Sequence, residues 1–377
     1  MNSEHSSSTA SSSSLSSSSD GAVGEDANMQ LLSGSREHET SHVSSRNIGQ
    51  FKLAALIFFT VSGGPFGIEQ NVATFGPLPS ILGMVVYPML VSYPTAMVVS
   101  EQTSKNAKDG GFVHWTSTAF GRRAGFVNAV LSFLSGCADT TLYPKLFMNT
   151  LEQTGNFSSL SITMIGVVFG VSLYALILSG VRLTGAVSVL FAIITASSLL
   201  LTSAVAIPHF NSTTLLQQPT QTTSTSIGLY ISTLYWNYSG IDTTSLIASK
   251  VKNPRQLYPR AMKWAIILAI TLNSVPILFL SGADKDWPSW QAGSFVKAAK
   301  VVGGNSLSTI FLVGALLSCV SMFIAEILED SYLLYGSAKI YGPSFLTIQN
   351  ERSPWVRNTF DILTDVIYTF YTFDFDF

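Results

Sequence analysis

Residues 60–70 read TVSGGPFGIEQ and lie within the first long apolar run of the chain. A helix in lipid satisfies its own backbone hydrogen bonds, so an interruption persists only where protein or a water-filled cavity pairs the freed groups. Proline removes one backbone donor, and glycine adopts conformations that other residues avoid. The stretch therefore predicts a half-helix to about Val61, unwound chain at 62–65 and a second half-helix from about Phe66.

The composition indicates that lipid is the main solvent of this chain. Its 377 residues are 47% hydrophobic and 11% charged, whereas soluble domains carry about a quarter charged residues. Apolar stretches long enough to cross about 30 Å of hydrocarbon as helix occur at 51–75, 77–100, 123–148, 160–180, 183–207, 227–248, 260–282 and 306–328. We expect an all-α polytopic membrane protein with about eight transmembrane helices.

The two ends of the chain differ from this apolar part. Residues 1–50 are serine-rich and lack the basic and apolar regions of a signal peptide, so they predict a disordered cytoplasmic tail. The transmembrane domain is expected at 51–342. After it, residues 343–377 end in IYTFYTFDFDF, which is too short to span as helix and predicts an atypical cytoplasmic tail.

The distribution of positive charge predicts the orientation. With the N-terminus in the cytoplasm, the inner segments carry sixteen lysines and arginines and the outer loops only Lys285, Lys297 and Lys300, as expected from the positive-inside rule. The glycosylation motifs at Asn156 and Asn211 fall outside, which predicts the secretory route and the plasma membrane. A net charge of −2 predicts no nucleic-acid partner.

A second interruption falls in the sixth span, which reads LYWNYSGIDTTSLIASKV over residues 234–251. Its glycine, Gly240, lies among polar residues that are too dense for a lipid-facing helix. Interruptions at corresponding positions of two five-span units are typical of transporters built from inverted repeats, which bind substrate at the midplane. The pattern predicts a secondary transporter that works by alternating access.

Four stretches carry a family resemblance: VSGGPFGIE at 61–69, DGGFVHW at 109–115, LSGCADTTLYPKLF at 134–147 and KVKNPRQLYPRAM at 250–262. There the chain resembles the amino acid, polyamine and organocation (APC) transporter superfamily, and within it the polyamine transporter branch of plants and trypanosomatids. The resemblance implies an inverted-repeat, LeuT-like fold with the first and sixth helices discontinuous. It also implies import of polyamines or amino acids, often coupled to protons as in a symporter.

The resemblance implies a substrate site between the broken spans and the third span. Carried over by position, its residues are Ser62, Gly63, Gly64, Gly67 and Glu69, then Asp139 and Tyr143, then Trp236, Asn237, Ser239 and Asp242. Two departures leave the choice between polyamine and amino acid open. Ser239-Gly240-Ile241 stands where the branch has Asn-Tyr-Trp, and Lys250 stands where an acidic residue is usual.

Glu69, Asp139 and Asp242 are intramembrane carboxylates, which suit a substrate with several ammonium groups. Each has an alternative role. Glu69 would also favourably meet the helix dipole, by about 0.3–1 kcal/mol, and Asp242 could cap a half-helix. Asp139 is six residues from Lys145, which places the two on different helix faces and argues against their pairing.

Proton coupling has two candidate groups. They are Glu69 and Glu326, since a buried carboxylate can exchange a proton. A solvated helix end is the alternative for Glu326. Tyr143 and Trp236 could contact an alkylammonium by cation–π interaction, although aromatic residues are also common in membrane cores.

A rival hypothesis is a truncated, non-transporting paralogue or gene-model fragment, because only three predicted spans follow the first five and the second repeat is incomplete. The sequence contains no motif of a membrane enzyme, so we expect neither catalysis nor a cofactor. Cys137 and Cys319 lie within spans and are expected to be small core residues rather than metal ligands.

Overall fold

The computed structural model describes residues 46, 48–152, 180–217, 219 and 226–342, with isolated residues between 161 and 168. Contacts divide the chain into Met1–Arg46 and Asn47–Phe377, and the helices below belong to the second unit. Most of the predicted span 160–180, nearly all of the tail 1–50 and the whole of the tail 343–377 lie outside the described residues, as does Asn156.

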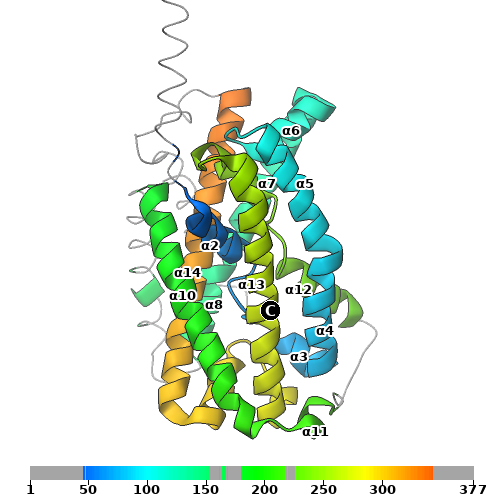
Figure 1. The fold of residues 1–377 in the computed structure, drawn as a ribbon, viewed down its shortest axis with the longest axis vertical. Helices are drawn as coiled ribbons and strands as arrows, with labels where there is room; N and C mark the ends of the chain where they lie inside the picture. The colour runs from blue at the N-terminus through cyan, green and yellow to red at the C-terminus, as the bar shows by residue number, and fades with distance from the viewer. Residues whose placement is uncertain are drawn as a thin grey trace, which may run out of the picture. The chain divides into compact units, whose positions relative to one another are not determined.

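Helices make up the described part of the second unit (Figure 1). Four are long and apolar enough to cross a membrane: Pro77–Lys105, Val181–His209, Pro254–Ala283 and Ser294–Tyr341. The first of these contains α4 (Pro77–Tyr87), a π-helical turn (Pro88–Ser92) and α5 (Tyr93–Lys105), and the others contain α10 (Val181–Ala206), α13 (Pro254–Ala283) and α14 (Ser294–Tyr341). The shorter helices are α2 (Gln50–Val61), α3 (Glu69–Phe75), α6 (Gly111–Phe120), α7 (Arg122–Thr140), α8 (Leu142–Glu152), α11 (Ser212–Leu215) and α12 (Ser226–Trp236).

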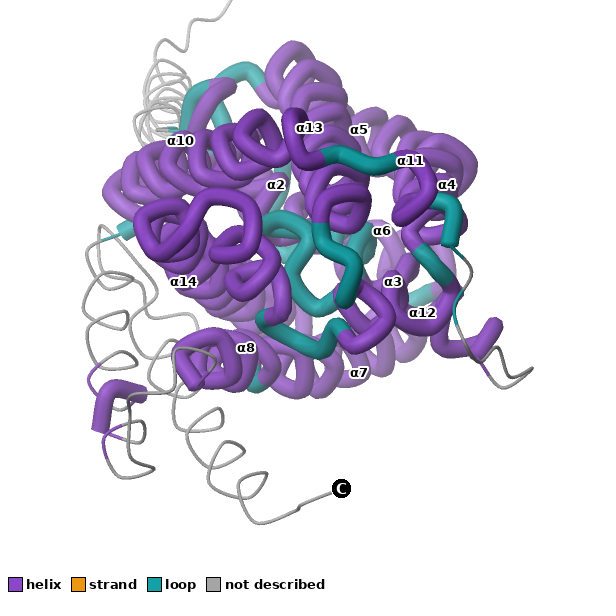
Figure 2. Tube along the Cα trace, turned by 90° about the horizontal axis from the view of Figure 1, so that it is seen from below, coloured by secondary structure: helices purple, strands orange, loops and turns teal. Residues whose placement is uncertain are grey.

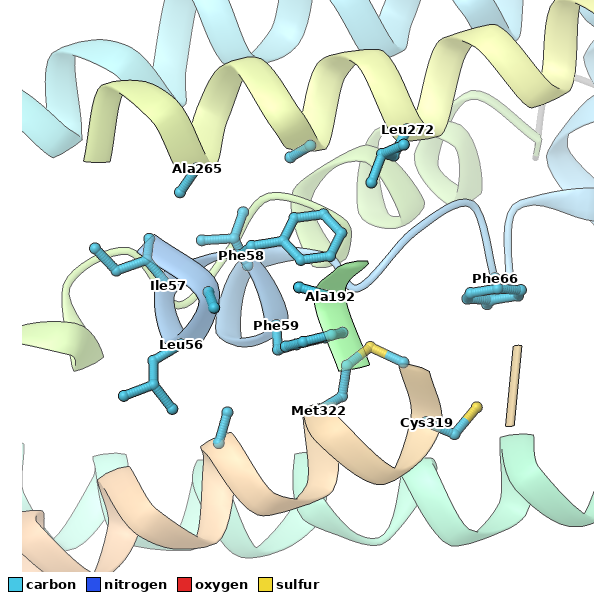
Figure 3. Packing of buried hydrophobic residues seen from close by; sticks show 14 of the residues in the cluster. Leu56, Ile57, Phe58, Phe59, Phe66, Ala192, Ala265, Leu272, Cys319 and Met322 are labelled. Carbon is cyan, nitrogen blue, oxygen red and sulfur yellow. The ribbon is translucent and has the colours of Figure 1, made fainter. Parts of the chain in front are cut away.

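The short helix α2 lies in the interior of the bundle and packs against α10, α13 and α14. Figure 3 shows Phe58 of α2 between that helix and α13, and Phe59 directed toward Met322 of α14. Because lipid tails are as apolar as these side chains, close packing rather than the hydrophobic effect must hold such helices together. Buried alanines recur at every fourth position along α13, at 261, 265 and 269, and small residues of this kind allow close helix approach.

Two predicted spans are interrupted in the structure. The stretch Ser294–Tyr341 consists of two helices joined across the non-helical residues Gly303 and Gly304, so the predicted start of the eighth span at 306 lies just after this kink. A short helix before the kink carries Lys297 and Lys300. The third predicted span is divided at Thr141 into α7 and α8.

The two ends of the bundle can be named by their short helices. At the α6 end, α6 packs against α14 and against a 3₁₀ helix, η3 (Thr243–Lys250). At the α11 end, α3 packs against the 3₁₀ turn Trp287–Ser289. The indole of Trp287 is fully buried there and donates to the carbonyl oxygen of Thr214 at 3.1 Å. Each broken span therefore has one half at each end.

The α6 end contains a close backbone contact that predicts the effect of a small substitution. A Cβ atom at Gly336 of α14 would lie within 3.0 Å of backbone atoms of Asp109 and Gly110. We expect Gly336→Ala to destabilise the fold by about 1–3 kcal/mol, because backbone cannot move aside as a flexible side chain can. The measurement is the Tm of the detergent-purified protein. Gly228→Ala is the control, since a Cβ atom there meets nothing within 4 Å; equal Tm values for the two variants would contradict the contact.

Candidate functional site

The first span is interrupted as predicted. Helix α2 ends at Val61, and α3 begins at Glu69. The unwound chain between them contains three glycines with positive φ, Gly63 (65°), Gly64 (126°) and Gly67 (87°), and side chains other than glycine rarely adopt these conformations. The predicted restart near Phe66 is wrong by three residues. The positive φ of Gly67 keeps the chain unwound beyond Phe66, whose ring packs edge-on against Phe311 at a centroid distance of 6.2 Å.

The second interruption also falls where the sequence predicts it. Helix α12 ends at Trp236, Gly240 has a φ of 82°, and the chain continues as the 3₁₀ helix η3. A Cβ atom at Gly240 would lie 3.0 Å from the carbonyl oxygen of Thr60, so the two broken spans touch at this glycine. Figure 2 shows non-helical chain in the interior of the bundle, bordered by α3, α13 and α14.

Four predicted site residues meet around one carboxylate. Trp236 Nε1 donates to Asp139 Oδ1 at 2.9 Å, and the Tyr143 hydroxyl donates to Asp139 Oδ2 at 3.1 Å. The Trp236 ring lies against Gly67, where a Cβ atom would be 3.1 Å from it. Residues Gly67, Asp139, Tyr143 and Trp236 are called the Asp139 cage below. Both donors are neutral, so neither supplies a positive charge to balance the carboxylate.

Lys145 does not neutralise this carboxylate either. Its side chain is exposed, and it lies on α8 whereas Asp139 lies on α7. Among the described residues, the ion pairs found join Lys105 to Glu101 and Lys339 to Asp109. No ion pair between Asp139 and Lys145 is found in the described part of the chain.

Three other predicted residues of the first break, Ser62, Gly63 and Gly64, contact the surrounding helices α13, α14 and α10. Asn273 Nδ2 of α13 donates to Ser62 Oγ at 2.9 Å. The Ser318 hydroxyl of α14 donates to the carbonyl oxygen of Gly63, and Gly64 lies near Leu199 of α10. The Ser318 bond thus pairs one freed backbone carbonyl of the unwound segment with a protein donor.

Two predicted residues of the second break make local contacts. Asn237 Nδ2 donates to the carbonyl oxygen of Thr233 at 3.0 Å, and Ser239 Oγ donates to that of Trp236 at 3.0 Å. Both bonds close the last turn of α12. The Asn237 side-chain oxygen is buried and has no hydrogen-bond donor among the described residues.

Glu69 is the first residue of α3, and its side chain is only 1% exposed. The backbone N–H of Gly67 donates to Glu69 Oε2 at 2.9 Å, and that of Gly293 donates to Oε1 at 3.0 Å. Gly293 directly precedes α14. Both carboxylate oxygens therefore bind backbone, and they join α3 to the start of α14.

Glu329 of α14 joins the two broken spans and was missed as a site residue in the sequence. The hydroxyl of Thr60, in the last turn of α2, donates to Glu329 Oε1 at 3.0 Å. The hydroxyl of Thr243, the first residue of η3, donates to Oε2. The side chain is 2% exposed. Its position just past the predicted eighth span was the available signal, because the helix continues for another three turns.

The two remaining acidic candidates are Glu326 and Asp242. Glu326 is 6% exposed, so the alternative of a solvated helix end is wrong. Among the described residues, no hydrogen bond or ion pair reaches its carboxylate. Asp242 occupies the N-cap position of η3. It makes no side-chain capping hydrogen bond that meets strict geometry, but the backbone N–H groups of Asp242 and Thr243 are close enough to interact with its carboxylate. Its side chain is exposed, although its neighbour Ile241 is buried.

Cys137 and Cys319 are both buried, as expected of small core residues, and neither forms a disulfide with a described residue. Within the described part of the chain, no group of three or more His, Cys, Asp or Glu residues is placed to hold a metal ion. The chemistry that this arrangement offers is the binding of organic cations by carboxylates and aromatic rings.

The amino acid permease family matches residues 48–352, which is most of the chain. The chain belongs to this family. The permease is 32% identical over 340 residues to Polyamine transporter RMV1 from Arabidopsis thaliana, covering 87% of this chain and 69% of that relative. It is 33% identical over 301 residues to Polyamine transporter PUT1 from Oryza sativa subsp. japonica, covering 78% of this chain and 56% of that relative. The permease thus spans between about half and two thirds of the length of these relatives.

Its fold is that of MHP1, a nucleobase-cation-symport-1 family transporter solved in a closed conformation with bromovinylhydantoin bound. The TM-score is 0.59, with 17% identity, and the match covers 89% of this chain and 74% of the other. The predicted family and LeuT-like fold class are confirmed. The permease is an integral membrane protein, and its named relatives are transporters rather than enzymes.

Proposed function

We propose that this permease is a secondary transporter that carries polyamines across the membrane by alternating access. The observation that carries the proposal is the Asp139 cage, in which a carboxylate between two aromatic donors lacks a cationic partner among the described residues. An alkylammonium would supply the missing charge and pack against the rings of Tyr143 and Trp236. The names of the relatives support the same substrate class.

The backbone of the first break favours a polyamine over an amino acid. An amino acid brings a carboxylate, which transporters of this architecture bind with the freed N–H groups of a broken helix. In this permease the N–H groups of Ser62 and Gly63 donate to the carbonyl oxygen of Phe58. That of Gly64 is bonded to the hydroxyl of Ser62, and that of Gly67 is bonded to Glu69. Because these four donors are occupied, a substrate without a carboxylate fits better.

We expect Asp139→Asn to raise the KM for putrescine uptake about tenfold, since the variant keeps the hydrogen-bonding shape but removes the charge that attracts the ammonium. The measurement is uptake of radiolabelled putrescine, spermidine and a panel of amino acids in transport-deficient cells, with surface expression confirmed. Lys105→Ala is the matched control, because that side chain is exposed and its ion-pair partner among the described residues is the equally exposed Glu101. Surface-expressed wild-type protein that takes up no substrate would instead support the non-transporting alternative.

The orientation follows from the charges at the two ends of the bundle. Lys105, Lys250 and Lys339 lie at the α6 end, which we propose to be cytoplasmic together with the N-terminus. Asn211 is exposed at the α11 end, beside α11. Its glycosylation there would be consistent with an outward-facing α11 end in the plasma membrane.

We propose that transport is coupled to protons, with Glu69 and Glu326 as the candidate carriers. Both side chains are almost fully buried, and their environments differ. Glu69 accepts two backbone N–H donors, so its protonation would weaken the contact between α3 and Gly293. A proton at this carboxylate could thus be linked to the opening of the α11 end.

A further inference from the structure

The side chain of Glu326 is a buried ionisable group to which no described residue gives a hydrogen bond or an ion pair. It is 6% exposed. An unpaired buried charge is strongly unfavourable, and ionisable groups within a membrane are functional by default. A ligand that spends part of the transport cycle beside Glu326 would supply the missing partner.

The groups that face Glu326 are also acidic. Asp330 lies four residues later on the same face of α14, and Asp139, Asp242 and Glu329 are close enough to repel Glu326 electrostatically. Of these, Glu329 is already bound by the hydroxyls of the two broken spans. Residue Asp242 is exposed and only the backbone N–H groups of Asp242 and Thr243 reach its carboxylate among the described residues, so Glu326 and Asp242 can both contact a ligand.

Geometry places this acidic face of α14 beside the Asp139 cage. The Asp330 carboxylate lies against the backbone of Gly136 of α7, one helical turn before Asp139. The hydroxyl of Tyr143 bonds to Asp139, and Tyr143 is also close enough to Glu326 to interact electrostatically with it. Tyr143 therefore stands between two anionic positions.

The cations on the same elements are occupied elsewhere. Lys339 of α14 pairs with Asp109 at 2.9 Å at the α6 end. The ammonium of Lys250, in η3, lies 5.9 Å from the centre of the Tyr332 ring. Neither is joined to Glu326.

We infer that Glu326 and Asp242 form a second ammonium-binding subsite, which together with the Asp139 cage selects diamines and longer polyamines over monoamines. The inference rests on the proposed transport of polyamines and assigns residues to the second charge of the substrate. Among the described residues the carboxylates are not grouped as a metal ion would require, whereas separated ammonium groups on one flexible chain can reach separated carboxylates. Because one carboxylate cannot hold a proton and an ammonium at once, this assignment leaves Glu69 as the candidate for a co-transported proton.

The test compares amines of equal length with one or two charges. In wild-type protein, putrescine should inhibit uptake of radiolabelled spermidine at a concentration at least tenfold lower than n-butylamine does. In Glu326→Gln, the inhibition constant of putrescine should rise at least tenfold and that of n-butylamine less than twofold. Asp242→Asn should behave likewise, whereas Asp139→Asn should weaken both amines.

Equal inhibition by putrescine and n-butylamine in the wild-type protein would overturn the second subsite. This comparison uses the wild-type protein alone, so its outcome does not depend on whether a variant reaches the surface. An equal loss of both amines in Glu326→Gln, or no loss of either, would also overturn it. In each of these cases spermidine is still transported, so the proposed function stands. Absence of spermidine uptake by surface-expressed wild-type protein would be the different result that removes the proposed function itself.

Discussion

Glu329→Ala is expected to reduce polyamine uptake at least a hundredfold while changing the thermal stability far less. The carboxylate is the single acceptor that receives one hydroxyl from α2 and one from η3. Each hydrogen bond to a charged group contributes about 1.5–3 kcal/mol, so the loss of both removes about 3 kcal/mol or more from the closed arrangement of the two broken spans. The measurements are the initial rate of uptake per surface molecule and the Tm of the purified protein.

The difference between activity and stability follows from what the two hydroxyls do without Glu329. Thr60 can donate to the carbonyl oxygen of Leu56 at 3.0 Å, and Thr243 to that of Gly240 at 2.7 Å. Neither hydroxyl is left unpaired, and the fold avoids the desolvation cost of a buried donor. The variant therefore loses the hydrogen-bonded connection between the two broken spans, whereas each span itself stays folded.

The uptake rate of Glu329→Gln should lie between the rates of the wild-type protein and the alanine variant, because the amide retains one carbonyl oxygen as acceptor. Glu101→Ala is the control for removing a carboxylate from a transmembrane helix end, since that side chain is exposed and contacts Lys105 alone among the described residues. Uptake by Glu329→Ala within a factor of two of the wild-type rate would show that the two broken spans move without this link. A large fall in Tm with proportional loss of uptake would show that Glu329 is structural only.

The interruptions could be predicted from the sequence because they are local. Glycine and proline act on the backbone where they stand, and their cost in lipid makes them informative. The restart of the first span was misplaced because Gly67, with a φ of 87°, extends the unwound chain beyond Phe66. A glycine is allowed in a helix as well as in unwound chain, so its presence alone does not fix the residue at which the helix restarts.

The residues of the Asp139 cage could also be predicted from the sequence, whereas the hydrogen bonds that join Glu329 to Thr60 and Thr243 could not. Asp139, Tyr143 and Trp236 were found because they stand in stretches that resemble a family. Thr60 and Thr243 are ordinary threonines in the sequence, and Thr60 is 269 residues away from Glu329. Threonine hydroxyls in membrane helices usually bond to the preceding turn, so nothing in the sequence distinguishes the two that reach across to α14.

Glu69→Gln is expected to open the α11 end of the site and to raise the reactivity of Cys319 toward a membrane-impermeant maleimide at least tenfold. The variant replaces one of two carboxylate oxygens by an amide nitrogen, which cannot accept the N–H of Gly67 or of Gly293. Losing one hydrogen bond to a charged acceptor costs about 1.5–3 kcal/mol, which is a tenfold or larger shift toward the open arrangement.

Cys319 is a suitable reporter because it is 1% exposed and close enough to Glu69 to interact with it electrostatically. In the packed core, its thiol lies near the unwound chain that carries Phe66 (Figure 3). The labelling is done in a Cys137→Ser background, so that Cys319 is the one remaining thiol of the chain, and Glu101→Gln serves as the control for a lost surface charge. If labelling stays at the wild-type rate while uptake is lost, Glu69 acts on the substrate or on the proton, and the contact with Gly293 does not control access to the site.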